Sequence, residues 1–458
     1  MAKIKKSTKR KAVRAAKRHP KAVIAIVIIL VVIIAVGALL YLKVDSVHTS
    51  VDNLIAKYTT SSTSAVSGNN AASGKGDAVT ETKTDTSDNN GGNSGGTDLT
   101  NENGGASETG ENGGSGDTGN TPTVTTYGDN DLSFHFLELG NNYTGDSTYI
   151  KAGDIDILID AGSRQDSADA IAAYVDQYCT DGKLEYVIAT HAHQDHIAGF
   201  VSTKKRPGIF ERYKCGIIID FAQTKATSAV YNNYVAARDK EVSEDGATHY
   251  TALDCCNQTD GAQKVYSLGE GMSMTILYQD YYATQSNDEN DHSVCVLFTH
   301  GSKNYLLTGD LEEKGEASLV KHNPDLPEVE LFKAGHHGSY TASTTTLLSV
   351  IKPKIVCVCC CAGAVEYTQT AANTFPSQAF VDRVAPYTDA VYVTTVGTVE
   401  YNEEKKKYED TGFASMNGVI TVLSHAGEVT VTCSNNNAKL KDTDWFKANR
   451  TCPTAWSG

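Results

Sequence analysis

The sequence predicts a mixed α/β domain built as an αββα sandwich, in which two sheets stack and helices cover their outer faces. Two observations lead to this prediction. A strand, helix and strand follow one another between residues 133 and 189, and the same order returns between residues 293 and 334. In both halves, Asp and His side chains come directly after apolar runs, and sites in α/β folds gather at strand ends.

The first half is expected to contain strands, a helix and a return strand, in that order. Alternating or apolar runs predict strands at residues 133–139, 147–152, 154–160 and 184–189. Apolar residues at helical spacing predict a helix over residues 167–179, capped by Ser167 or Asp166. The second half is expected to place strands at 293–298, 304–308 and 330–334, with a helix at 312–321.

Between the halves, residues 202–269 fit this order poorly. They include a predicted strand at 215–221 and a helix that carries Tyr231, Tyr234 and Arg238. Such an insertion either shapes the substrate cleft or only adds packing. Cys357, Cys359, Cys360 and Cys361 fall in an apolar run at 354–362, where we expect packing in a buried strand rather than metal binding.

The N-terminal region has a different composition from the rest of the chain. Residues 1–21 hold ten Lys and Arg residues and no acidic residue, so the formal net charge of −15 leaves −25 for the remaining residues. Residues 22–42 carry no charge, and about 20 apolar residues are needed to cross a bilayer. A cleaved signal peptide would have a shorter apolar run and a small-residue cleavage site. We therefore expect a single transmembrane helix with the basic tail in the cytoplasm.

Residues 43–130 are expected to form a flexible extracellular linker. From residue 59 to 127 this segment is mostly Ser, Thr, Gly, Asn and Asp, and it has too few apolar side chains to offset the entropy of folding. The remaining residues, 131–458, form the predicted folded domain. The number of cysteines is eleven, so at least one is unpaired within the chain.

Residues 190–199 contain the strongest chemical signal in the sequence. His191, His193, Asp195 and His196 lie within six residues, directly after an apolar run. This spacing allows the first two side chains to face one cation and the last two to face another about 3.5–4 Å away. The alternative is a hydrogen-bonded histidine cluster in a loop. The HxHxDH order resembles the signature of the metallo-β-lactamase fold, which implies an αββα sandwich of that type.

The resemblance extends to polar residues after other predicted strands. Asp160 ends the strand at 154–160 and would orient a metal-binding histidine from behind. Asp310 resembles the aspartate that two metals share, although the cap of the following helix is an alternative. In residues 333–339, His336 is favoured as a ligand and His337 as a transition-state donor. The third ligand of the first metal is left open between His292, Asn290 and a water.

One branch of this superfamily shares further motifs with the chain, and the resemblance covers about residues 131–433. These motifs appear in the order seen in the metallo-β-lactamase-like domain of ComEC-type DNA-internalisation competence proteins: Gly145-Asp146-Ser147, residues 158–162, the HxHxDH motif, Asn290-x-x-Ser293, residues 307–312, residues 333–339, Asn373-x-x-Pro376 and residues 417–420. There are two departures. The multi-span permease region of those transporters is absent, and residues 397–415 look like an insertion.

The resemblance implies a hydrolase with two divalent metal ions, and the expected transmembrane helix would anchor it to the membrane with the folded domain outside the cell. Zinc is expected, with manganese and iron as alternatives. A water shared by the metals would lose a proton near neutral pH and attack the substrate. Asp195, His337 and Lys333 are the expected catalytic residues, the last two as positively charged donors. A phosphodiesterase or nuclease is the predicted activity, because the ComEC-type branch is thought to process DNA.

Other functions stay open at this point. A charge of −25 after residue 21 argues against a long nucleic acid, so short phosphodiesters and cell-wall phosphodiesters such as teichoic-acid substituents are alternatives. A lactonase or β-lactamase is another, although the usual third histidine is lacking. A surface module without catalytic activity could keep the metal site for structure. No protein partner can be identified from the sequence.

Overall fold

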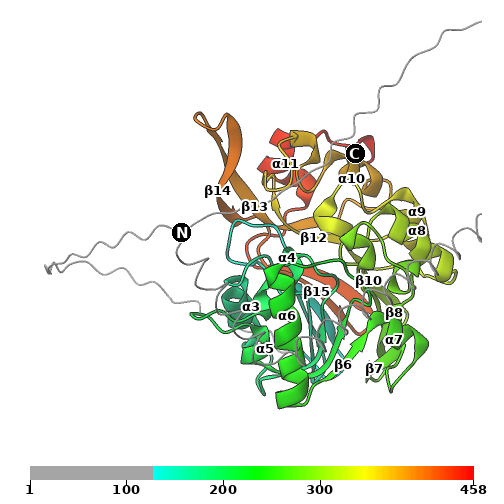
Figure 1. The fold of residues 1–458 in the computed structure, drawn as a ribbon. Helices are drawn as coiled ribbons and strands as arrows, with labels where there is room; N and C mark the ends of the chain where they lie inside the picture. Colours follow the sequence, from blue (N-terminus) through cyan, green and yellow to red (C-terminus); the bar gives the residue numbers. More distant parts are fainter. Residues whose placement is uncertain (1–126, 458) are drawn as a thin grey trace, which may run out of the picture. The chain divides into compact units, whose positions relative to one another are not determined.

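Two eight-stranded sheets form the centre of the computed structural model, which describes residues 127–457 (Figure 1). The first sheet has the order β16-β15-β1-β2-β3-β4-β5-β6 and the second has the order β14-β13-β12-β11-β10-β9-β8-β7. The strands of the first sheet are β1 (Leu132–Phe136), β2 (Thr148–Ala152), β3 (Ile155–Ile159), β4 (Lys183–Ile188), β5 (Lys214–Asp220), β6 (Thr248–Thr251), β15 (Ile420–His425) and β16 (Glu428–Cys433).

The second sheet repeats the plan of the first. Its strands are β7 (Val265–Gly269), β8 (Met272–Leu277), β9 (Cys295–His300), β10 (Lys303–Leu307), β11 (Leu331–Lys333), β12 (Ile355–Ala362), β13 (Val391–Asn402) and β14 (Lys407–Ser415). Neighbours from β3 to β6 run parallel, as do neighbours from β10 to β13. The carboxyl ends of these parallel strands meet at one edge of each sheet, which is the usual place for a site in an α/β fold.

Helices flank the two sheets. They are α3 (Ser167–Val175), α4 (Gln194–Ile197), α5 (Ile209–Arg212), α6 (Ala229–Lys240), α7 (Ala252–Asn257), α8 (Glu313–His322), α9 (Thr345–Ile351), α10 (Gln378–Val384) and α11 (Asp444–Asn449). Figure 1 shows α3 and α6 beside the first sheet and α8 and α9 beside the second. The apolar side chains of α8, α9 and α10 pack with those of β11 and β12 in one buried cluster. This layering is the predicted mixed α/β sandwich.

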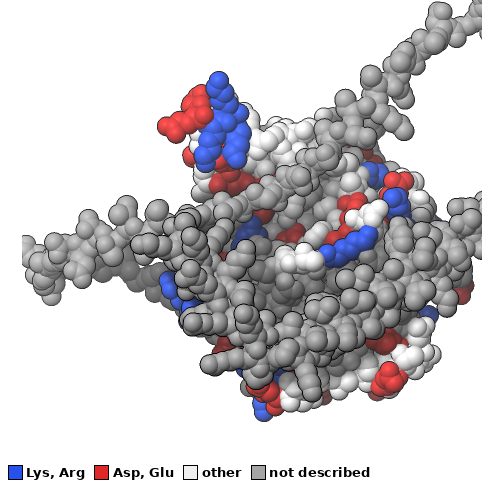
Figure 2. All heavy atoms as spheres, in the orientation of Figure 1, with Lys and Arg blue, Asp and Glu red and all other residues white. Residues whose placement is uncertain are grey.

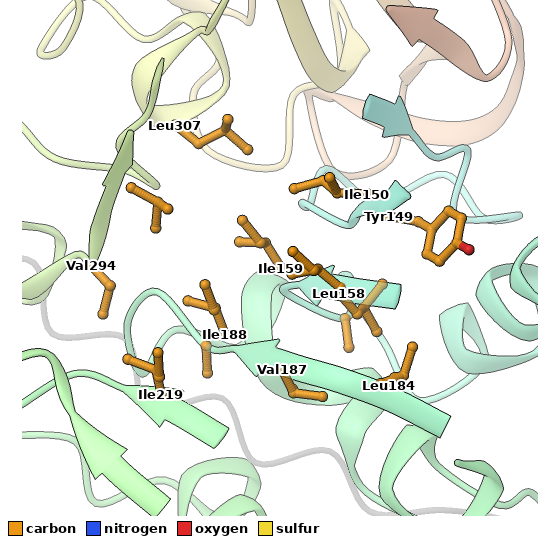
Figure 3. Close-up of a cluster of buried hydrophobic side chains, with 14 of the residues drawn as sticks. Tyr149, Ile150, Leu158, Ile159, Leu184, Val187, Ile188, Ile219, Val294 and Leu307 are labelled. Atoms are coloured by element: carbon orange, nitrogen blue, oxygen red, sulfur yellow. The ribbon is translucent and has the colours of Figure 1, made fainter. Parts of the chain in front are cut away.

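The main core lies between the sheets. Phe134 of β1 packs against Phe298 of β9 and Tyr305 of β10, with ring centroids 5.3 and 4.8 Å apart. Figure 3 shows Val294 and Leu307 facing Ile159 and Ile188 within the same buried cluster. Fully buried aliphatic side chains of this size each stabilise the fold by about 1.5–3 kcal/mol. The core therefore holds the strand ends that carry the polar site residues.

Several elements differ from the predicted bounds. The helix expected over residues 167–179 ends at Val175, because Tyr178 turns back to pack on Tyr174 and His135. Asp166 precedes its first turn without a capping side-chain hydrogen bond. Residues 202–269 extend the first sheet through β5 and β6 and supply β7 at the edge of the second sheet. The four cysteines of β12 are buried, as predicted.

The predicted basic tail, transmembrane helix and most of the linker lie outside the described residues. Among residues 127–457, no helix is both long and apolar enough to cross a membrane.

Candidate metal centre

Four buried side chains from three strand ends meet at the carboxyl edge of the sheets. Asp195 and His196 lie in α4, which follows β4; Asp310 follows β10; and His337 lies in a 3-10 turn after β11. Each offers one potential ligand atom, and these atoms all lie within 4.8 Å of one another. Because carboxylate oxygens and imidazole nitrogens bind divalent metals, this set fits a metal ion.

Close backbone packing places the HxHxDH loop. The backbone N–H of Ala161, just after β3, donates to the carbonyl of His196 at 2.7 Å, and that of Gly199 donates to the carbonyl of Ala161 at 2.9 Å. A Cβ at residue 199 would lie 2.0 Å from the Ala161 carbonyl oxygen. Residue 199 must therefore be glycine for the loop to approach β3 and turn His196 inward.

Hydrogen bonds fix which nitrogen of each central histidine faces the cluster. His196 Nδ1–H donates to Asp160 Oδ2 at 2.7 Å, and His337 Nδ1–H donates to the Cys359 carbonyl at 2.9 Å. Nε2 of His337 then lies 3.2 Å from both Asp195 Oδ2 and Asp310 Oδ2. In a neutral imidazole, the lone pair of Nε2 would face these two carboxylates, so a cation between them removes the repulsion.

The charge balance of the centre also fits bound cations. Asp146, Asp160, Asp195 and Asp310 are buried, and within residues 127–457 Lys333 is the one buried ammonium in contact with them. Burial alone would raise the pKa of Asp310, but His196, His337 and Lys333 lower it well below its usual value. Conversely, Asp310 raises the pKa of both histidines against the effect of burial. Divalent ions would supply the positive charge that the histidines otherwise provide.

His191 and His193 form a second group at the rim. His191 Nε2 lies 3.0 Å from His193 Nδ1, and Nδ1 of His191 lies 3.1 Å from the Thr190 hydroxyl. His191 is buried and His193 is exposed. His191 Nε2 and His193 Nδ1 are close enough to share one ion, although no third ligand atom from a His, Cys, Asp or Glu of the described part of the chain lies within 4.8 Å of both.

His336 lies next to His337, with ring centroids 5.9 Å apart, and a carboxylate orients its imidazole. Its Nδ1 donates to Glu312 Oε1 at 2.9 Å, and its Nε2 lies 4.0 Å from Asp310 Oδ2. His336 and His337 both have left-handed backbone conformations, with φ of 45° and 53°. Such conformations cost roughly 1–3 kcal/mol each and occur where a site requires them. The turn thereby aims the two imidazoles at neighbouring positions of the centre.

The two residues considered for the open ligand position form hydrogen bonds with groups other than the four clustered ligands. His292 donates through Nδ1 to the Tyr281 carbonyl at 3.1 Å, and Asn290 donates to Glu312 Oε1 at 3.2 Å. The serine of the same pattern is closer, because Ser293 Oγ lies 3.4 Å from His191 Nδ1 and accepts the Asp310 N–H at 3.1 Å. Ser293 therefore contacts both His191 and the backbone of Asp310.

The side chain of Lys333 is buried. Its Nζ contacts Asp146 and the Gly309 carbonyl, and it lies 3.4 Å from Asp310 Oδ1. The ammonium group is thus placed to neutralise two carboxylates from behind the cluster.

Three residues of the site were given no role by the sequence. Asp146 pairs with Lys333; the motif that contains it was noted in the sequence, but no chemical role could be assigned to it there. Glu312 orients His336. Tyr367 donates its hydroxyl to Asp195 Oδ2 at 2.7 Å, from a loop 172 residues further along the chain. Nothing in the spacing around Tyr367 indicates this contact.

Two open grooves flank the centre. One, of about 520 Å³, is lined by His193, Gln194, Lys225 and Asn287. The other, of about 480 Å³, is lined by Glu312, Tyr340, Thr341 and Arg383. Both have room for the polar groups of a substrate next to the metal-binding side chains.

Residues 140–209 match the family model of the metallo-beta-lactamase superfamily. Recombination protein 2 of Haemophilus influenzae is 30% identical over 134 residues, which cover 29% of this chain and 16% of the relative. ComE operon protein 3 of Bacillus subtilis is 22% identical over 172 residues, which cover 38% of this chain and 19% of the relative. The matched segments thus span less than a fifth of these relatives.

A solved structure, the metallo-beta-lactamase fold protein YhfI from Bacillus subtilis, is 14% identical, with a TM-score of 0.31, and the match covers 56% of this chain and 81% of that one. The family model and the curated relatives confirm the resemblance predicted from the motifs.

Proposed function

Because the chain carries a metallo-β-lactamase fold and is related in sequence to ComE-type competence proteins, we propose that it is a metal-dependent hydrolase that cleaves phosphodiester bonds. The observation that carries this proposal is the convergence of Asp195, His196, Asp310 and His337 in a buried cluster with excess negative charge. The substrate class is part of the proposal. The relatives match this chain over only a small part of their own length, so their substrates cannot be assigned to it.

The chain offers ligands for two divalent ions, for which zinc is proposed and manganese and iron are alternatives. His191 and His193 would hold the first ion. Asp195, His196 and His337 would hold the second, and Asp310 is the ligand that both ions would share, as the resemblance to the superfamily implies. When bound, two such ions lower the pKa of a water and stabilise negative charge that develops on the substrate.

The surrounding residues prepare these ligands. Asp160 and the Cys359 carbonyl hold a proton on Nδ1 of His196 and His337, which leaves each Nε2 as the ligand atom. Lys333 keeps Asp310 ionised at the bottom of the site. The side chain of Tyr367 is about half exposed. Its hydroxyl donates to Asp195 and can donate instead to an oxygen of the substrate. Burial raises the pKa of the nearby Cys359 thiol, so this cysteine stays protonated and is a poor nucleophile.

Membrane anchoring and an extracellular position belong to the same proposal and rest on residues 1–42. A tethered domain of this charge would favour short or cell-wall phosphodiesters over long polyanions. The competing proposals are a lactonase, a β-lactamase, and a protein without catalytic activity whose metal site only stabilises the fold.

The test uses the full chain purified in detergent. Bound metal is measured by mass spectrometry, and hydrolysis of bis-p-nitrophenyl phosphate, linear DNA and nitrocefin is compared with that of an Asp195→Ala, His196→Ala variant. The proposal expects bound metal and phosphodiester cleavage that the variant loses. A folded wild-type protein that binds no metal would refute every hydrolase version, and cleavage of nitrocefin alone would refute the phosphodiesterase.

A further inference from the structure

The insertion at residues 397–415 forms a hairpin beside the metal centre. It consists of the outer part of β13 and β14, and it stands out from the rest of the domain in Figure 1. Seven large hydrophobic side chains are exposed in the described chain, and five of them lie on this hairpin or on adjoining loops: Tyr143, Tyr367, Tyr401, Tyr408 and Phe413. Such clustering of exposed aromatic side chains marks a binding surface.

Strand register puts the hairpin aromatics on one face. Tyr401 pairs with Tyr408, and Phe413 pairs with Gly397, so all three side chains share the face of residues 397, 399 and 401. Asp410 lies on the same face, and its Oδ1 accepts the Val365 N–H at 2.8 Å. A Cβ at residue 397 would also contact Ala364. The aromatic face therefore turns toward residues 363–373, which we call the strap.

The strap connects this face to the metal centre. Tyr367 donates to Asp195, and its ring packs on Phe375, with centroids 5.3 Å apart. Phe375 in turn lies 5.7 Å from the ring of His337. Further out, Gln369 exchanges two hydrogen bonds with the backbone of Tyr408, at 3.1 and 3.0 Å. The aromatic surface thus runs from the metal ligands to the exposed Tyr401 and Tyr408 pair.

The charges of the hairpin do not favour binding through phosphates. Residues 400–410 contain five acidic residues and three lysines. Lys405 and Lys407 lie 2.9 and 3.5 Å from Glu409, and Figure 2 shows both signs together on the hairpin. Since a phosphate-binding surface needs an excess of positive charge, this surface would recognise an uncharged ring rather than a polyanion.

We propose that the hairpin and the strap form a recognition wall for the substrate. This recognition wall binds a singly charged phosphodiester in which one ester substituent carries a flat ring, such as a nucleobase. The ring stacks on Tyr401 and Tyr408, while the phosphate reaches the Tyr367 hydroxyl and the cations that the proposed centre would hold. This inference rests on the proposed phosphodiesterase function and narrows its substrate class.

The test compares two diesters of equal charge that both lose an alkoxide: thymidylyl-thymidine, which has rings, and glycerophosphoglycerol, which has none. The full-length Tyr401→Ala, Tyr408→Ala variant is compared with a Glu400→Ala, Lys407→Ala control, which alters the opposite face and keeps the net charge. Because stacking on an aromatic side chain contributes about tenfold per base, the tyrosine variant should lose roughly tenfold or more in kcat/KM for thymidylyl-thymidine only. If the tyrosine variant lost kcat/KM equally for both diesters, or for neither, the proposed recognition wall would be refuted.

A binding measurement separates this inference from the hydrolase proposal. Calorimetry with thymidine 5′-monophosphate should show binding to the wild type and the control, and at least tenfold weaker binding to the tyrosine variant. If the wild type cleaves neither diester but shows this pattern, the wall is supported and the phosphodiesterase is not. Equal binding to all three proteins refutes the wall. Thermal unfolding of each variant confirms that the exposed substitutions leave the fold intact.

Discussion

Asp160 Oδ2 accepts the Nδ1 proton of His196 at 2.7 Å, so that the opposite nitrogen lies 3.1 Å from Asp310 Oδ2. Asp160 itself is held by the Thr190 N–H and hydroxyl, both at 2.8 Å. One carboxylate at the end of β3 thereby sets the orientation of an imidazole of the proposed metal centre on the loop after β4.

The first prediction concerns this carboxylate. Asp160→Ala should weaken zinc binding by about 10–100-fold, because partners behind metal-bound histidines contribute on this scale. Asp160→Asn keeps an acceptor and suits the left-handed φ of 60° at this position, so its loss should be smaller. Competition with a chromogenic chelator measures both, and equal affinity of wild type and Asp160→Ala would contradict the orienting role.

The second prediction concerns the close approach of the HxHxDH loop to β3. Gly199→Ala should lower the free energy of unfolding by about 1–3 kcal/mol or more, because its methyl group would overlap the Ala161 carbonyl. Gly412→Ala is the control, since its Cβ would lie 3.7 Å from the nearest side chain. Urea unfolding of both variants decides the point, and equal stability would show that the loop can relax.

The third prediction concerns the ammonium group behind the cluster. Lys333→Met leaves Asp146 and Asp310 without their buried positive partner and should cost roughly 3–5 kcal/mol in the metal-free protein. Zinc should restore part of this stability, because a ligand that binds only the folded state stabilises it. Lys352→Met, on an exposed lysine paired with Glu328, should change little. A variant that unfolds like wild type without metal would contradict this role of Lys333.

The fourth prediction concerns pH. Burial raises the pKa of Glu316 from 4.5 to about 7, although Ser343 and Thr344 donate hydrogen bonds to it. The folded protein thus holds a proton that the unfolded chain releases, so this contribution to stability is lost as pH rises from 4.5 through 7. The stability of wild type minus that of Glu316→Gln should fall over this range in urea titrations. A constant difference would show that Glu316 stays ionised.

The strands and the polar residues that follow them could be predicted from local patterns in the sequence. The period-two run at residues 133–139 and the apolar run at 354–362 predicted strands there, and the polar residues after the predicted strands placed Asp160, Asp195, Asp310 and the pair of histidines at 336 and 337 near a common edge. Of that pair His336 was favoured as the ligand, whereas His337 is the one that lies in the buried cluster. The end of α3 was misplaced because it depends on Tyr178 packing against His135 from another strand.

Contacts between distant segments could not be predicted. Tyr367 reaches Asp195 only because β12 and α10 carry the strap over the site, and no local pattern encodes that path. Likewise, the insertion at residues 397–415 was visible, but its aromatic face depends on the register of β13 with β14.

The most direct test of the account is the zinc content of the purified full chain, measured by mass spectrometry after removal of loosely bound metal. We expect two equivalents in the wild type and a loss of both sites in Asp310→Ala, because Asp310 is the ligand that the two ions would share and lies next to His196 and His337. A folded wild-type protein with no zinc, manganese or iron after growth with each metal would contradict it.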